Sequence, residues 1–506
     1  MAITAGDNLN SVPASGKQTL ASNYLDLAGT TNEGWAQQYL PDLMEKEAEV
    51  FGPRTISGFL SQVGAEEAMS ADQVVWSEQG RLHLSYKGHV HSTAGGIDGA
   101  GTGTATSQID LTQDIDGNTD IASGNHGVRV NDTVVISDST NGVVKCLVVK
   151  VATDRIDVAP YTAATLTGTT SGTATTILVY GSEYVKGVGY YEADGITTGG
   201  TANSRGANEP TFKSFQNKPI IIKDYYEVSG SDSARVGWVE VASEGGQSGY
   251  LWYLKAEADT RARFNDYLEM SMLEAEKTAG ASLANLAGVA YETTDTLPHG
   301  TEGLFAAIED RGNLTSGVTG VNAATDLAEF DAILAEFDKQ GAIEENMMFV
   351  NRATSLAMDD MLASMNSYGA GGTSYGVFDN SEDMALNLGF SGFRRGSYDF
   401  YKSDMRYLND KATRGGINDA SSANAIRGVM VPAGTSTVYD QMMGKNLKRP
   451  FLHVRYRASQ TDNRKLKTWT TGSVGATTSA LDAMQIHMLS ERCLVTQGAN
   501  NFMLMK

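Results

Sequence analysis

A serine in a glycine-framed turn has the residue type and spacing of a catalytic nucleophile. "GTSYG", Gly372 to Gly376, has the G-x-S-x-G spacing that can present Ser374 as an acyl-transfer nucleophile. Such a turn needs a strand before it and a helix after it, whereas here a helical pattern and the loop "NSYGAGG" come first. We therefore interpret the stretch as a Gly/Ser loop. A serine hydrolase using Ser374 stands as one alternative function.

Acidic residues recur in "DIDGNTD", which spaces four oxygen-bearing side chains two positions apart: Asp114, Asp116, Asn118 and Asp120. This spacing is typical of calcium loops, but the helix-loop-helix form needs Gly at its sixth position and Glu at its twelfth. Thr119 and Asn125 stand there, so we interpret the stretch as a polar turn between strands. A secreted or surface-layer β-rich adhesin with a calcium site is the other alternative function. It predicts a secretory signal, and the first residues lack the basic and apolar runs of one.

Two histidines, His89 and His91 in "HVH", fall on one face of a predicted strand. A third ligand from His83 or Glu78 would complete the three that a catalytic zinc ion normally needs. The 7 histidines are scattered and no H-E-x-x-H motif occurs, so we interpret the pair as ordinary strand residues. The sequence is predicted to hold no catalytic residue, no cofactor and no metal site.

Composition narrows the function classes further. The 506 residues include 60 acidic and 39 basic ones, and the net charge of -21 argues against a surface that binds nucleic acid through its phosphates. Cys146 and Cys493 have neither disulfide nor metal spacing and are predicted to be buried free thiols. No apolar run is long enough to cross a bilayer, so we expect a soluble protein with no membrane partner.

One basic run stands out in this acidic chain, "GKNLKRPFLHVRYR". Two interpretations stay open for its five cations, namely contact with acidic partners or neighbouring subunits, and pairing with local acidic residues. The cations are Lys445, Lys448, Arg449, Arg455 and Arg457.

The elements around these residues are dominated by one long helix. "KAEADTRARFNDYLEMSMLEAEKTAG" contains no Gly or Pro before Gly280 in a chain with 55 Gly, and the pattern predicts a helix over 249–280. Glu257 and Arg261 are spaced for an i,i+4 ion pair. The predicted apolar face carries Tyr250, Leu254, Phe264, Leu268, Met272, Ala275 and Ala279.

Short strands and α/β alternation flank that helix. Residues 93–210 are rich in Gly, Thr, Ser and Val, and their short strands predict an inserted domain that is a small antiparallel barrel or sandwich, of which we favour the barrel. Residues 301–440 alternate helical patterns with the strand "NMMFVN", which is typical of a sheet covered by helices. Residues 441–506 return to strand patterns that could close a sheet against the long helix.

The stretch "NKPIIIKDYYEVSGSDSARVGWVEVASEGGQSGYLWYLKAEADTRARFNDYLEMSML" resembles the major capsid protein of tailed bacteriophages, Caudoviricetes, in its passage from an extended loop through a "VSG" turn into a spine helix. The ending "RCLVTQGANNFMLMK" is similar to a C-terminus of the same family. That fold is shared with herpesvirus shells. The insert has the size and position found in crAss-like phages, a subgroup that the resemblance also suggests.

The resemblance implies the α+β fold of that family. The small β-barrel domain inserted at 93–210 departs from it, because simple members of the family lack this insert, which lies within the extended loop. The implied parts of the chain are an N-terminal arm at 1–35, a peripheral domain at 36–72, 231–300 and 441–506 with the spine helix at 249–280, an extended-loop hairpin at 73–92 and 211–230, the inserted domain at 93–210, and an axial domain at 301–440.

The implied function is structural and not enzymatic. The chain would self-assemble into hexamers and pentamers of an icosahedral head that encloses packaged double-stranded DNA. The expected partners are other copies of the chain, portal and scaffolding proteins and head auxiliary proteins. The expected location is the virion capsid, assembled in the host cytoplasm.

Overall fold

The computed structural model describes residues 59–60, 64–92, 107–162, 166, 172–186, 212–233, 240–242, 248–278, 298–365, 392–420, 424–440, 445–474 and 477–506. The predicted N-terminal arm, residues 1–35, and Ser374 lie outside them. The chain divides into two compact units. We call Met1–Trp76 with Phe215–Lys506 the main unit and Ser77–Ser214 the barrel unit.

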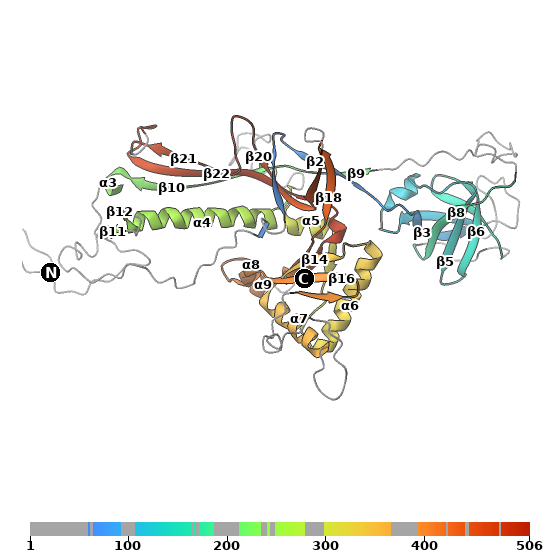
Figure 1. Cartoon of the computed structure of the whole chain (residues 1–506). Coiled ribbons are helices and arrows are strands. Elements are labelled where there is room, and N and C mark those ends of the chain that lie inside the picture. The colour runs from blue at the N-terminus through green and yellow to red at the C-terminus, as the bar shows by residue number, and fades with distance from the viewer. Residues whose placement is uncertain are drawn as a thin grey trace, which may run out of the picture. The chain divides into compact units, whose positions relative to one another are not determined.

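A five-stranded sheet forms one layer of the main unit (Figure 1). Its central strand, β22 (Ala483–Thr496), is 14 residues long and almost wholly buried. The strands run in the order β1 (Ala65–Met69), β20 (Leu452–Arg457), β22 and β10 (Ile220–Ser229), and β21 (Lys467–Gly472) also pairs with β22. Within this sheet only β1 and β20 pair in parallel. The sheet combines β1, from the first part of the chain, with β20, β21 and β22 from the last part.

The long helix α4 (Leu251–Glu274) lies along β10 and β22 in Figure 1. Its 24 residues make a rod about 36 Å long, at about 1.5 Å per residue. The helix is shorter than the predicted 249–280, because strand β12 (Ser248–Tyr250) precedes it and the chain turns extended after Glu274.

A close backbone contact explains the C-terminal end of α4. Thr278 N–H donates to the His299 carbonyl over 3.0 Å, and Gly303 N–H donates to the Ala275 carbonyl over 2.8 Å. A Cβ at Gly303 would lie 2.8 Å from the Ala275 nitrogen, so only glycine allows this approach. The residues after Glu274 therefore pair with a returning segment instead of continuing the helix.

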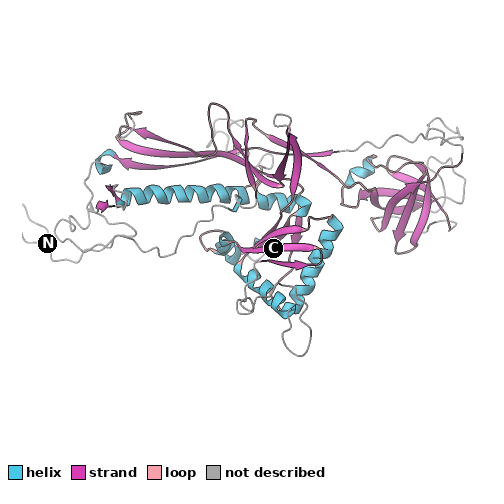
Figure 2. Ribbon diagram, in the orientation of Figure 1, coloured by secondary structure: helices cyan, strands magenta, loops and turns pink. Residues whose placement is uncertain are grey.

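A six-stranded sheet forms the second layer, with helices on both faces (Figure 2). Its strands run in the order β13 (Asn313–Thr315), β23 (Met503–Met505), β17 (Gly428–Pro432), β14 (Glu345–Val350), β16 (Tyr398–Asp404) and β15 (Gly392–Arg395). The last residues of the sequence thus belong to this sheet, whereas the sequence assigned all of 441–506 to the sheet against the long helix.

Alternation along the strands separates the two faces of this sheet. Met348 and Met430 pack with the helices α6 (Ala323–Gln340) and α7 (Arg352–Met365) in one core cluster. Their neighbours Phe349 and Val429 belong to a second cluster with α5 (Leu304–Arg311) and the end of α4. These helices and the strand β14 agree with the alternation predicted for 301–440.

Short elements complete the main unit. They are α3 (Gly230–Ser233), β11 (Glu240–Ala242), α8 (Arg406–Asn409), α9 (Arg414–Ala420), β18 (Thr435–Asp440), β19 (Lys445–Pro450) and the 3-10 helix η7 (Ala499–Asn501). Strand β11 pairs with β12, and β18 pairs with β19.

A two-stranded ribbon of β2 (Val74–Gln79) and β9 (Phe212–Asn217) stands where the chain passes between the units. It is shorter than the hairpin predicted from 73–92 and 211–230. Strand β3 (Ser85–Ser92) belongs to the barrel, and β10 belongs to the five-stranded sheet. The ribbon is shorter than predicted because β3 pairs with β4 and β8 of the barrel, and β10 pairs with β22 of the five-stranded sheet.

The barrel unit is a closed, antiparallel barrel of six strands. Their order is β3, β4 (Ser107–Asp114), β7 (Arg155–Pro160), β6 (Gly142–Val151), β5 (Asp132–Asp138) and β8 (Thr175–Ser182), with the 3-10 helix η2 (Thr119–Ser123) after β4. Inward residues such as Val134, Cys146 and Ile156 are fully buried. The predicted fold class, α+β with an inserted small barrel, is confirmed.

None of the helices within the described ranges is long and apolar enough to span a membrane.

Candidate functional site

The apolar face of α4 packs against the five-stranded sheet. Phe264 and Leu268 are buried and form a core cluster with Met488 of β22, and Ile222 of β10 packs against it. One turn later, Met272 joins the main core that also receives α5 and both sheets. The predicted apolar face is therefore confirmed for Phe264, Leu268 and Met272, and Phe264 and Leu268 hold the helix against strands β10 and β22.

Arg261 and Arg263 of α4 each form an ion pair. Arg261 donates to Glu257 over 2.9 Å, which confirms the predicted i,i+4 pair. Arg263 reaches Asp224 of β10 over 3.4 Å. The Arg side chains of these pairs are about half exposed, so each pair contributes little to stability.

The C-terminal end of α4 is tied to the segment of α8 and α9. Glu274 accepts hydrogen bonds from the Tyr407 hydroxyl and from Arg414, each over 2.7 Å. Burial, and then the hydrogen bond to Glu274, raise the pKa of Tyr407 well above its usual range. The hydroxyl therefore remains protonated and donating, and α4 is held at its end by a hydrogen bond as well as by packing.

Two cations of the basic run are paired within the main unit. Arg455 lies 2.8 Å from Glu67, its neighbour in the register of the parallel strands β1 and β20. Arg457 donates to Glu491 over 2.6 Å and also to Asp72, and the hydrogen bond to Asp72 raises the pKa of Arg457. Local pairing is the outcome for these two arginines.

The other three cations of that run, Lys445, Lys448 and Arg449, have side chains outside the described set.

An aromatic row crosses the outer face of the five-stranded sheet. Tyr225 of β10 and Trp469 of β21 both stand opposite His487 of β22 in register. The ring centroids are 5.9 Å apart for Tyr225 and His487 and 5.2 Å apart for Trp469 and His487. Tyr225 is 57% exposed, and its strand places it on the face opposite Ile222 and α4. The row is an aromatic surface on the sheet against which α4 packs.

The base of the β2/β9 ribbon is anchored by an arginine. The guanidinium of Arg311 in α5 stands over the rings of Phe215, at 4.3 Å, and Trp76, at 5.7 Å. The same guanidinium donates to Glu302 over 2.8 Å. Next to it, Asn217 of β9 donates to the carbonyls of Glu302 and Leu494. The sequence analysis missed this anchor, because its members are far apart along the chain and each is ordinary alone.

The acidic turn after β4 uses its oxygens within the chain. Asp114 accepts from the Asn118 N–H over 2.7 Å, and Asn118 accepts from the Asp120 N–H over 3.2 Å. Asp116 accepts from Arg81 over 2.9 Å. These are the bonds of a polar turn, as the sequence analysis interpreted it.

Both thiols are buried, as predicted. Burial raises the pKa of Cys146 to about 12 and that of Cys493 to about 12, and for Cys493 it outweighs the opposing effect of Arg455. The thiolate that reacts as a nucleophile or binds a metal is therefore strongly disfavoured at both positions.

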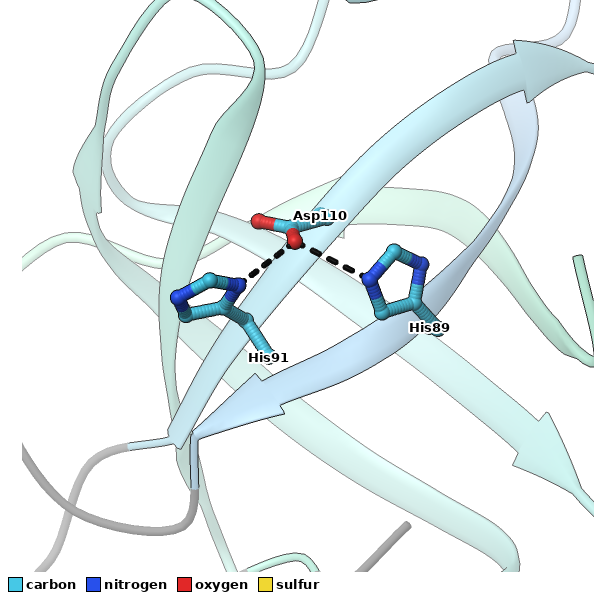
Figure 3. Close-up of side chains that lie close together, drawn as sticks. All are labelled: His89, His91 and Asp110. Atoms are coloured by element: carbon cyan, nitrogen blue, oxygen red, sulfur yellow. Dashed lines mark hydrogen bonds and ion pairs between the residues drawn. The ribbon is translucent and has the colours of Figure 1, made fainter. Parts of the chain in front are cut away.

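His89 and His91 meet a carboxylate that the sequence analysis did not consider. Asp110 of β4 stands directly opposite His89 in register, and a register shift between Val90 and Ser92 brings His91 toward the same carboxylate. Oδ2 of Asp110 lies 3.0 Å from Nε2 of His89 and 2.7 Å from Nδ1 of His91 (Figure 3). His83 and Glu78, the ligands considered from sequence, are not members of this cluster.

The signal that could have found Asp110 is in "SQIDLTQD", where a carboxylate lies between Ile109 and Leu111 of an alternating strand. An antiparallel neighbour can bring such a residue onto the histidine face, but the pairing itself is not readable from local sequence.

Comparisons with known proteins return structural matches alone. No family model matches the sequence, and no curated protein matches it. The chain is similar to a structure of Microbacterium phage Oxtober96 with a TM-score of 0.34, 9% identity, and 92% of this chain and 95% of that chain covered. It is also similar to the capsid of a native GTA particle, with a TM-score of 0.34, 10% identity, and 94% and 97% covered.

A third similar structure is the mature capsid of bacteriophage PhiM1, with a TM-score of 0.29, 9% identity, and 62% of this chain and 78% of that chain covered. Two of the three are thus described as capsids, and all three TM-scores are low. The case for a function therefore depends on the packing and charges of the chain itself.

Proposed function

We propose that this chain is the major capsid protein of a tailed bacteriophage, and that copies of it assemble into hexamers and pentamers of an icosahedral head. The observation that carries the proposal is the packing of α4 along β10 and β22, with Phe264 and Leu268 buried against the sheet. This packing is what the sequence resemblance implied for a spine helix. We accordingly assign the layer of α4 and its sheet to the peripheral domain, and the six-stranded sheet with α6 and α7 to the axial domain.

The physical reason is the mechanics of a shell. A subunit of a thin shell must carry contacts from one edge to the other, and a continuous helix fixed to long strands is a stiff element for that purpose. Closed assemblies of identical subunits need complementary edges and sufficient buried area, not a catalytic group. We therefore propose a structural and not an enzymatic role.

Neighbouring copies are proposed to cover the aromatic row of Tyr225, His487 and Trp469. Aromatic residues are enriched where protein interfaces are buried. The row lies on the sheet to which α4 is fixed, so a contact there would act on the stiffest part of the subunit.

The charge of the chain fits an enclosure for DNA. A chain with a net charge of -21 is expected to repel the phosphate backbone, so double-stranded DNA could move inside a shell of such chains without binding tightly. Portal, scaffolding and auxiliary proteins are further proposed partners, and the virion capsid, assembled in the host cytoplasm, is the proposed location.

Electron microscopy of the purified chain tests the proposal. After expression, we expect shells, tubes or ring-shaped capsomers in negative stain and a matching large species by size-exclusion chromatography. The variant Tyr225→Glu should reduce particle yield while the yield of soluble subunit is kept. Compact monomers of the unaltered chain at every salt concentration would contradict the proposal.

A further inference from the structure

We propose that His89, His91 and Asp110 bind a divalent transition-metal ion, preferably Zn²⁺, between strands β3 and β4 of the barrel. The three side chains offer two ring nitrogens and one carboxylate oxygen, and these ligand atoms all lie within 4.8 Å of one another. Figure 3 shows both rings directed at the same carboxylate. The site lies wholly within the barrel unit.

The chemistry of the ligand set suits zinc. Two imidazoles and one carboxylate form one of the three-ligand sets that hold Zn²⁺ in proteins, with a fourth position left to water. Bonds of about 2.0–2.1 Å around a tetrahedral ion place neighbouring ligand atoms about 3.3 Å apart. The observed separations from Asp110 Oδ2, 2.7 Å to His91 and 3.0 Å to His89, would need to widen by about 0.6 Å and about 0.3 Å to reach that spacing.

The hydrogen bonding of His89 points to a cation between the ring and the carboxylate. Its Nδ1 lies 3.1 Å from the Gly172 carbonyl oxygen, and a carbonyl can only accept, so Nδ1 carries the proton. In the neutral ring, Nε2 is then an acceptor, yet it faces the Asp110 oxygen at 3.0 Å. Two acceptors at that distance repel unless a positive charge lies between them. A second ring proton or a metal ion can supply that charge. We propose the metal ion, because a ligand histidine that donates its other N–H to a carbonyl is the usual arrangement.

The second oxygen of Asp110 is also held. Arg155 Nε lies 3.3 Å from Oδ1 of Asp110, close enough for an ion pair although not in hydrogen-bond geometry. Asp154 lies 3.3 Å from the same nitrogen and offsets part of its charge. Arg155 thus leaves Oδ2 directed at the two rings, as expected for a carboxylate that binds metal through one oxygen.

The exposure of the three ligands and their place on two paired strands indicate how a bound ion would be reached and what it would stabilise. The His91 side chain is 42% exposed, whereas His89 and Asp110 are 13% and 15% exposed. The open fourth position therefore faces solvent from the side of His91. Because His89 of β3 stands opposite Asp110 of β4, the bound ion would crosslink the two strands, and its occupancy should raise the thermal stability of the barrel.

Metal titration of the full chain tests the inference. The purified chain is stripped with EDTA, exchanged into buffer at pH 7.5 and titrated with ZnCl₂ by calorimetry, and with CoCl₂ by visible absorption. We expect one saturable site per chain, visible bands of four-coordinate Co²⁺ that Zn²⁺ displaces, and a rise in the melting temperature of the barrel with Zn²⁺.

Three variants identify the ligands. Asp110→Asn keeps the shape of the side chain, and His91→Gln changes a partly exposed residue, so both should fold with unchanged circular dichroism but bind Zn²⁺ at least about tenfold more weakly. His83→Gln removes an exposed histidine outside the cluster and should bind as the unaltered chain does. Absence of saturable binding would overturn the proposal in favour of a doubly protonated His89, and equal binding by all variants would overturn it in favour of an adventitious ion.

Discussion

The five-stranded sheet packed against α4 has open edge strands, whereas the six-stranded barrel has none. The sheet is open, with β1 and β10 at the ends of its strand order, whereas the barrel pairs every strand with two others. The buried cluster of the barrel contains only residues of that unit, while the main core joins α4, α5 and both sheets of the main unit. Closure removes the edges through which strands associate. The barrel therefore has no free strand edge, whereas the main unit has open edges at which, under the proposed function, other copies would make contact.

The largest expected effect is at the centre of the α4 contact. Leu268→Asp places an unpaired charge in a side-chain position that is 4% exposed, and it should destabilise the main unit by more than about 4 kcal/mol. The yield of soluble chain is the measurement. Ala258→Asp introduces the same residue at an exposed position of the same helix and should cost about 0.7 kcal/mol or less. Equal, normal yields of both variants would show that α4 does not pack on this sheet.

A core change in the barrel should stay within the barrel. Ile156 is fully buried there, and Ile156→Ala should lower the stability of that unit by about 3 kcal/mol. Calorimetry should show one transition moving to lower temperature while the other stays. Val143→Ala, at a position 70% exposed, is the control with little effect. A shift of both transitions by Ile156→Ala would mean that the units unfold together.

The ribbon anchor should give an intermediate effect on the main unit. Arg311→Ala removes the guanidinium from the rings of Trp76 and Phe215 and from Glu302, at a cost of about 2 kcal/mol. Chemical denaturation of the main unit is the measurement. Asp310→Ala removes a carboxylate that is 75% exposed and lies 3.9 Å from Arg311 Nε, and this loose surface pair should change the midpoint little. If the midpoint shifted as little for Arg311→Ala as for the control, Arg311 would not anchor the ribbon.

The smallest effect is expected for the ion pair on the surface of α4. Arg261→Ala breaks the ion pair between Arg261, which is 53% exposed, and Glu257, which is 27% exposed. The loss should lower the free energy of unfolding by about 0.3–0.5 kcal/mol. The difference should disappear in high salt, because exposed charges are screened. A loss above about 1.5 kcal/mol that persists in salt would show that the pair is part of a larger interaction.

Local pattern was sufficient to predict some of this architecture. The helix of α4, its apolar residues Phe264 and Leu268 and the Glu257–Arg261 pair follow from a spacing of three and four residues. The inserted barrel followed from short strands between glycine-rich turns.

Contacts between distant segments could not be predicted in this way. The end of α4 at Glu274 depends on pairing with the segment around Gly303. The place of Met503–Met505 in the six-stranded sheet depends on β13 and β17. The carboxylate at His89 and His91 depends on the register of β3 against β4. Each is set by tertiary pairing, which leaves no trace in the neighbouring sequence.

Removal of the barrel is the most direct test of the claim that the main unit alone builds the assembly. In the shortened chain, a Gly/Ser linker replaces residues 80–211 and joins β2 to β9. Negative-stain electron microscopy should then show particles of the same diameter from the shortened chain and the full chain, with the unfolding midpoint of the main unit unchanged. Particles from the full chain together with soluble, folded but unassembled subunits from the shortened chain would contradict the claim.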